Sequence, residues 1–475
     1  MATITSTGLG SGLDVESIVS KLVSIEKQPI TALQTRTDTI KTQISAYGKI
    51  QSAFSAMRDA ASKLTTPASW AALTATSSDA SMATVTASTG SGAGSYAVSV
   101  TNLAAAQSLS SQAYTSTAAV GAGSLTIELG QWSADNSTFT GKGGTSPVSV
   151  TIGASDTLST VRDKINSSGA GVLASVVTDA SGSRLVIRSK DTGVENGFRI
   201  TAADADGNNG DATGLSALAY DPTASVASLT RNVAAANANL TINGLDISSA
   251  TNSIESAVDG LSINLLKKGD LTVTVGQDKD AVKKVVTDFV TAYNSLMTML
   301  RDNTKYDESS KSAGALQGDS TAVSLQAQLR NITSSGSTLG GSFARLADIG
   351  LNIGSNGLIT VDNSKLTSAM GHISDVKQLF MGVDNTNADN SGIAQRWRKF
   401  ADQVLSVDGS ITTRTSGLQS RVTANTKRSD EMTDRAAAYE KRVRAQYTAL
   451  DTQMAKLNDM SSYVSKITSM LSSSS

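Results

Sequence analysis

The chain has 475 residues, a formal net charge of -1 at pH 7 and no cysteine. The near-zero charge provides no overall attraction to nucleic acid or to an anionic membrane. Without cysteine, neither disulfide nor thiolate chemistry is available. Charged residues make up only 17% of the chain, so the polar surface must come largely from Ser, Thr, Asn and Gln.

The N-terminal segment, residues 1–14, has neither the basic region nor the apolar region of a Sec signal. It is rich in Gly, Ser and Thr, with Ile4, Leu9 and Leu13 as isolated apolar side chains. We expect it to be flexible until it is bound. No stretch of the chain approaches about 18 apolar residues, so no transmembrane helix is expected.

Two helices are predicted next. Asp14 is the first candidate for the cap of the first helix, and Ser17 is the second. Pro29 is expected to interrupt this helix, and the second helix ends before the Thr66-Pro67 dipeptide. The apolar residues that give both helices one face are Ile18, Leu22 and Ile25, then Leu33, Ile40, Tyr47, Phe54 and Ala61, with Ile50, Met57 and Leu64 beside them.

Alternation of apolar and polar residues replaces helical spacing from about Ser77 and predicts strands. Asn243-Gly244 between two short apolar runs indicates a hairpin. Asp156 is the expected cap of one short helix, and residues 203–239 are expected to form a long loop. The predicted strands cover residues 96–100, 125–129, 148–152, 172–177, 185–187, 198–200, 240–242, 245–247, 261–265 and 271–275.

Helical spacing returns at Asp280 and continues, apart from a hairpin predicted over 351–361. Ser320 is the expected cap of one of these helices. Another is expected to extend to Val407 and Ile411, and Gly417 is expected to separate it from the C-terminal tail.

The tail, residues 418–475, contains no Gly and no Pro, and its apolar residues recur every seven positions. About 50 such residues in a helix would span roughly 80 Å, which is longer than the 30–64 helix that could cover them. Residues 445–471 should therefore need other chains. The apolar seam consists of Leu418, Val422, Met432, Ala436, Tyr439, Val443, Leu450, Leu457, Met460, Val464, Ile467 and Leu471, with Asn425, Gln446 and Gln453 as polar members.

These patterns predict an α+β multidomain protein, in which long terminal helices form a coiled-coil or helical-bundle leg and two β-rich lobes, sandwich or barrel-like, are inserted between them. The expected division is a terminal coiled-coil arm (1–45 plus 430–475), a helical leg domain (46–78 plus 279–429), an inner β lobe (79–112 plus 232–278) and an outer β lobe (113–231).

No constellation of residues indicates catalysis, a cofactor or a metal. The one histidine, His372, is expected at the surface or at a helix cap. The acidic run from Asp204 to Asp211 lacks the Gly and Glu that a calcium loop needs. The basic residues Lys441, Arg442 and Arg444 flank the seam and are expected on a solvated coiled-coil face.

Several motifs resemble one family. The opening Gly8-Leu-Gly10-Ser-Gly12-Leu-Asp14, with Glu26-Lys-Gln-Pro29-Ile after it, closely resembles the start of the bacterial flagellar filament cap, the flagellar hook-associated protein 2 family. Further matching segments are Asn243-Gly244, 289–296, 314–320, 346–351, 357–362, Lys365-Leu366, Val376 with Leu379-Phe380, and Tyr447, Leu450, Met454 and Ser462-Tyr463 in the tail. The resemblance is weak in the outer lobe, residues 113–231.

The resemblance implies a structural, non-enzymatic protein that is exported by the flagellar secretion apparatus without a Sec signal and lies outside the cell at the filament tip. Its implied partners are its own copies in a ring of about four to six, flagellin, hook-junction proteins, and a cytosolic export chaperone on the C-terminal helix. Flagellin subunits would insert beneath the ring. The residues expected to contact partners are Leu9, Leu13, Ile18, Leu22, Ile25, Leu33, Ile40, Tyr47, Val443, Leu450, Leu457, Val464, Ile467 and Leu471.

Three alternatives remain open at this point. Another flagellar axial protein, either a flagellin or a hook-junction protein, would share paired terminal helices. Self-association discriminates, because a flagellin forms an open filament and a cap forms a small closed ring. A surface adhesin would use the β lobes to bind host glycan or mucin, and this could coexist with capping. A hydrolase has no catalytic residues in its favour.

Overall fold

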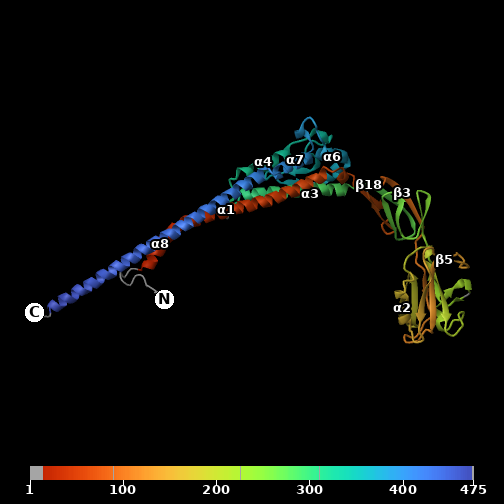
Figure 1. Cartoon of the computed structure of the whole chain (residues 1–475). Helices are drawn as coiled ribbons and strands as arrows, with labels where there is room; N and C mark the ends of the chain where they lie inside the picture. The colour runs from red at the N-terminus through yellow and green to blue at the C-terminus, as the bar shows by residue number, and fades with distance from the viewer. Residues whose placement is uncertain (1–13, 89, 225, 310, 473–475) are drawn as a thin grey trace. The chain divides into compact units, whose positions relative to one another are not determined.

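The computed structural model describes residues 14–88, 90–224, 226–309 and 311–472, apart from the side chain of Leu471. Leu9 and Leu13 therefore lie outside the described residues. The chain forms two compact units, one made of residues 1–70 and 279–475 and the other of residues 71–278. Both ends of the chain belong to the first, helical unit (Figure 1).

The first long helix, α1 (Val15–Leu64), is continuous. Asp14 is its N-cap, as predicted, and its Oδ1 accepts a hydrogen bond from the Ser17 N–H at 3.0 Å. The predicted interruption at Pro29 is wrong, because Pro29 lies inside the helix at an exposed position. Val23 and Ile30 are buried on either side of it. Their packing keeps the helix continuous although Pro29 has no N–H to donate a backbone hydrogen bond.

The last helix, α8 (Ser410–Ser472), has 63 residues and starts before Gly417. The predicted break at Gly417 is therefore wrong. Gly417 is exposed and an added Cβ would meet nothing there, so this glycine only weakens the helix, by roughly 1 kcal/mol relative to alanine. The break lies at residues 406–409 instead, and Val407, expected on an apolar helix face, is 85% exposed.

The central part of α1 and the start of α8 pack into a core with shorter helices. Trp397 is fully buried there, with its ring edge-on to Tyr293 at a centroid distance of 5.2 Å. Two short hairpins complete this unit, and the second is the one predicted over 351–361. The remaining elements are α3 (Lys279–Thr304), β19 (Tyr306–Asp307), β20 (Ser312–Ala313), α4 (Ser320–Ser334), β21 (Leu351–Ile353), β22 (Ile359–Val361), α5 (Asn363–Ala369), α6 (Ile373–Met381) and α7 (Ile393–Leu405).

Two predicted caps lie one residue away from the observed caps. Asp319, not Ser320, caps α4 and accepts hydrogen bonds from the Thr321 and Ala322 N–H groups. Thr157, not Asp156, caps the short helix α2 (Leu158–Ser167). In each case two adjacent residues are good cap formers, and the sequence pattern does not distinguish them.

The second unit is built from antiparallel sheets around two separate apolar cores. The first core lies between a five-stranded sheet, in the order β1-β18-β3-β14-β15, and a three-stranded sheet, in the order β16-β17-β2. The strands are β1 (Leu73–Ser77), β2 (Ala83–Ala87), β3 (Gly94–Asn102), β14 (Ala238–Ile242), β15 (Leu245–Ser249), β16 (Ser253–Val258), β17 (Leu261–Leu265) and β18 (Gly269–Gln277).

The second core lies between a six-stranded sheet, in the order β12-β11-β10-β5-β6 with β7 also paired to β5, and a four-stranded sheet, in the order β13-β4-β9-β8. Helix α2 adds Leu158, Val161 and Ile165 to it. The strands are β4 (Ser108–Ser110), β5 (Gly123–Trp132), β6 (Phe139–Gly141), β7 (Val148–Ile152), β8 (Val172–Asp179), β9 (Gly182–Ser189), β10 (Gly197–Asp204), β11 (Tyr220–Asp221), β12 (Val226–Ala227) and β13 (Thr230–Val233).

The predicted hairpin at Asn243-Gly244 is confirmed, and it joins β14 to β15. Both turn residues have positive φ, 50° and 82°, as a two-residue turn between twisted strands requires. The expected long loop over 203–239 is only partly a loop, because it contains β11, β12 and β13. These strands are two to four residues long, too short to produce a readable alternation.

Candidate functional site

The candidate functional site is the pair formed by α1 and α8, whose antiparallel register is fixed by two polar contacts far apart on the helices. Near the middle of α1, Tyr47 and Arg414 bind the same carboxylate, that of Asp319. Near the start of α1, Glu16 binds Arg444 through two hydrogen bonds of 2.6 and 2.9 Å. Both contacts give the same register, in which a residue of α1 and its neighbour on α8 have numbers that sum to about 460.

Asp319 joins three helices. Its Oδ1 accepts a hydrogen bond from the Tyr47 hydroxyl at 2.7 Å, its Oδ2 accepts one from Arg414 Nε at 2.9 Å, and the carboxylate caps α4. The Asp319 side chain is only 2% exposed. Burial alone would raise its pKa, but the hydrogen bonds from Tyr47, Arg414 and the Ala322 N–H outweigh burial, and the pKa is lowered. Asp319 therefore stays ionised and holds the start of α8 beside α1.

A small apolar cluster closes the other end of the pair. Val15, Val19 and Val23 of α1 are buried against Val443 of α8. Leu22, Tyr439 and Tyr447 pack around them. We call these seven residues the terminal cluster. Beside it, the hydrogen bonds and charge of Arg444 lower the pKa of Glu16.

Beyond the terminal cluster, α8 continues without α1 (Figure 1). The register places the first residue of α1 beside residue 445, so the last 26 or so residues of α8, about 40 Å of helix, extend past it. We call residues 447–472 the overhang; only Tyr447, its first residue, also belongs to the terminal cluster. Its exposed apolar side chains are Leu450 at 42%, Leu457 at 55%, Met460 at 59%, Tyr463 at 65%, Val464 at 57%, Ile467 at 41% and Met470 at 72%.

The predicted partner contacts that the structure describes fall into three groups. Tyr47 and Val443 are buried within the chain, at 0% and 5% exposure, and stabilise the helix pair itself. Half-buried positions on α1 are Ile18, Leu22, Leu33 and Ile40. Exposed positions are Ile25, Leu450, Leu457, Val464 and Ile467, whereas Leu9, Leu13 and the Leu471 side chain lie outside the description.

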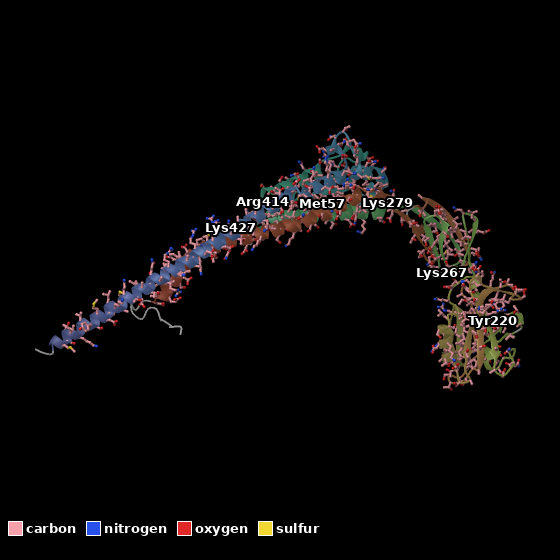
Figure 2. The ribbon with its side chains drawn as sticks, in the orientation of Figure 1. Met57, Tyr220, Lys267, Lys279, Arg414 and Lys427 are labelled. Atoms are coloured by element: carbon pink, nitrogen blue, oxygen red, sulfur yellow. The ribbon has the colours of Figure 1, made fainter. Side chains whose placement is uncertain are left out.

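Between the large core and the terminal cluster, the interface of the two helices is more polar. We call this part the bridge, residues 24–43 of α1 and 421–438 of α8; Lys427 lies within it (Figure 2). The buried positions include Thr37 as well as Ile30, Val422 and Ala436. A groove of about 420 Å³ opens here, lined by Arg36, Thr39, Ile40, Gln43, Arg421 and Asn425.

The acidic run at residues 204–211 is held by hydrogen bonds within the chain. The Asp204 carboxylate accepts hydrogen bonds from the backbone N–H and hydroxyl of Ser216. His372 is exposed at the N-terminal end of α6, and its side chain makes no capping hydrogen bond. Among the residues that the structure describes, no group of His, Cys, Asp and Glu could hold a metal ion, and no helix is long and apolar enough to cross a membrane.

Comparison with protein families matches most of the chain to one family. The profile for the N-terminal part of flagellar hook-associated protein 2 matches residues 11–107, and that for its C-terminal part matches residues 235–459. A flagellin hook IN motif matches residues 138–191. These matches include α1, most of α8 and the strands of the first β core.

Individual relatives match over nearly the whole length. Flagellar hook-associated protein 2 of Escherichia coli is 33% identical over 483 residues, covering 98% of both chains. The B-type protein of Pseudomonas aeruginosa is 30% identical and covers 94% of this chain and 93% of its own. A crystal structure of the flagellar cap protein FliD from Escherichia coli is 31% identical and covers 79% of this chain and 99% of its own, with a TM-score of 0.53.

Proposed function

The chain belongs to the flagellar hook-associated protein 2 family, which caps the filament of the bacterial flagellum, and we propose that it does so through the overhang of α8. It is a structural protein of the filament tip and not an enzyme.

The observation that carries the proposal is the row of exposed apolar side chains on the overhang. Leu457, Val464 and Ile467 follow the heptad spacing of the buried part of the same helix but are 41–57% exposed. A seam with this spacing is stable in water when a second helix covers it. Exposed apolar rows of this kind mark sites of protein association.

We therefore propose that copies associate into a ring of about four to six subunits, with overhangs that contact each other or the filament. Exported flagellin would be incorporated beneath the ring, and hook-junction proteins would be contacted before the filament forms. The polar seam positions Gln446 and Gln453 would weaken any one pairing. Neighbours could then be exchanged as the filament grows.

The same row would need protection inside the cell. A cytosolic export chaperone that binds residues 447–472 would cover it before secretion and release it at the tip. The two β cores would form the head lobes of the cap. Binding of host glycan or mucin by these lobes stays a separate prediction, to be tested with the full chain in a glycan-binding screen.

Electron microscopy of the purified full-length chain, with its mass measured in solution, tests the proposal. Closed rings of one subunit number are expected. Open filaments would favour a flagellin-like protein, and a monomer at all concentrations, both alone and with filament ends, would overturn the proposal.

A further inference from the structure

The groove in the bridge carries polar groups without partners. Among the described residues, Arg36, Gln43, Arg421 and Asn425 have no hydrogen bond or ion pair through their side chains. They surround the half-buried Ile40. The lining includes two guanidinium groups and two carboxamides but no acidic side chain.

The register explains why these groups converge. Arg36 lies level with Asn425, and Ile40 lies level with Arg421, because paired residue numbers sum to about 460. Positions 36, 40 and 43 recur at helical spacing on one face of α1, as 421 and 425 do on α8. Guanidinium and amide N–H groups that face one apolar floor are the chemistry that binds a carboxylate.

Unpaired carboxylates lie farther along the same helix. Asp430, Glu431 and Asp434 are exposed on α8, and in the described part of the chain none of them has an ion pair or hydrogen bond through its carboxylate. They follow the groove residues of α8 by about nine positions, or about 14 Å along the axis. The shortest separation is five positions, from Asn425 to Asp430, and in the described part of the chain none of the three carboxylates contacts the groove.

We propose that the groove of one copy binds the carboxylates of Asp430, Glu431 and Asp434 on α8 of the neighbouring copy. This inference rests on the proposed ring, in which every copy presents the same two surfaces to its two neighbours. A head-to-tail contact between different patches can close into such a ring. The contact requires the neighbouring helix pair to be shifted by about 14 Å along its own axis. Such a shift arises when the helix pairs are tilted relative to the axis of the ring.

The absence of cysteine makes cross-linking a clean test. One chain carries Thr39→Cys at the rim of the groove, and the other carries Thr433→Cys between the acidic residues. Within one chain, the two positions are separated by about 12 residues of helix, or roughly 18 Å, so an intramolecular disulfide is excluded. Under oxidation, the assembled mixture should yield a cross-linked dimer that neither variant gives alone.

Charge reversal tests whether the groove itself makes the contact. Arg421→Glu in the Thr39→Cys chain should lower the cross-link yield by about fivefold. Glu431→Lys with Asp434→Lys in the other chain should restore it. Arg435→Glu, an exposed charge outside the groove lining, is the matched control and should leave the yield unchanged.

The mass of the assembly, measured in the same samples, separates the possible failures. If rings form without a cross-link, or if Arg421→Glu does not change the cross-link yield, this inference is wrong and the proposed function is unaffected. If Arg421→Glu abolished motility while rings formed without a cross-link, the groove would serve flagellin instead, which also overturns it. Failure to form any ring would overturn both proposals.

Discussion

The Tyr47 hydroxyl donates a hydrogen bond of 2.7 Å to Oδ1 of Asp319, a residue 272 positions later in the chain. Arg414 binds the other carboxylate oxygen from the start of α8. One buried carboxylate thus joins α1, α4 and α8, and it sets the register that leaves the overhang without cover from α1. The Asp319 contacts therefore stabilise the helix pair and also determine which part of α8 forms the proposed assembly surface.

Replacing Tyr47 with phenylalanine should destabilise the helical unit. The variant keeps the buried ring but removes one hydrogen bond to a charged group, which costs about 2 kcal/mol. Urea unfolding followed by circular dichroism measures the change. Tyr306→Phe is the matched control, because Tyr306 is 50% exposed, and its stability should stay within about 0.5 kcal/mol of the parent. Equal stability of both variants would contradict the role given to Asp319.

Stability should depend on pH through Asp319. Its pKa is lower in the folded chain than in the unfolded chain, so its contribution is complete above the unfolded value of about 3.9 and is lost as pH falls through the folded value. The free-energy difference between the parent and Asp319→Asn should be largest at neutral pH and shrink below about pH 4. The difference for the exposed Asp430→Asn should stay close to zero throughout, and a constant difference for Asp319→Asn would refute the linkage.

The contact between Glu16 and Arg444 should hold the start of α1 without contributing to global stability, because both side chains are substantially exposed. Arg444→Gln should speed hydrogen exchange over residues 15–23 while the unfolding midpoint stays unchanged. The effect should fade in about 1 M salt, where the Debye length is about 3 Å. Lys441→Gln, which removes a nearby exposed charge, should show neither effect.

Charges placed on the overhang should separate assembly from folding. Leu457→Asp and Val464→Asp alter side chains that are 55% and 57% exposed, so the isolated chain should keep its stability within about 0.5 kcal/mol. Ring formation should fail, because the charge would be buried without a partner. Ser469→Asp adds the same charge on the opposite face of the helix and should still assemble. Leu418→Asp, at a position 1% exposed, should unfold the chain instead.

Pro29 should be a local weak point in α1. Pro29→Ala restores the missing N–H and should slow hydrogen exchange over residues 25–33, since proline inside a helix costs up to about 3 kcal/mol. The neighbouring exposed variant Gln28→Ala should change exchange little. Identical exchange in the two variants would mean that packing beside Pro29 already removes the weakness.

The sequence predicted the pairing of the two terminal helices and the β region between them, because heptad spacing and strict alternation are strong local signals. The phase of the seam at the start of α1 was less accurate. The prediction placed Ile18, Leu22 and Ile25 on the contact face. Leu22 does pack against the terminal cluster, but Ile25 is 60% exposed, and the buried residues there are Val15, Val19 and Val23. Because a break was expected at Pro29, the heptad spacing of residues 33–64 was not extended to the residues before Pro29. That spacing, extended, falls on Val15 and Val19.

The Asp319 contacts could not be predicted from the sequence. Tyr47 and Arg414 lie 272 and 95 positions from Asp319, and nothing local in a single sequence indicates which residues the fold will bring together. The groove could not be predicted for the same reason, since Arg36 and Arg421 become neighbours only through the register of the helix pair. Asn425 was recognised as a polar seam member, and that was the one signal that pointed to the bridge.

Hydrogen exchange over residues 447–472, compared between the dilute single chain and the assembled cap, measures whether neighbouring chains cover the overhang. Most of the stability of a protein helix comes from packing of its apolar face and not from helix propensity alone. We expect rapid exchange in the single chain and strong protection in the assembly, with residues 46–64 equally protected in both. Equal protection of residues 447–472 in the two states would contradict this expectation.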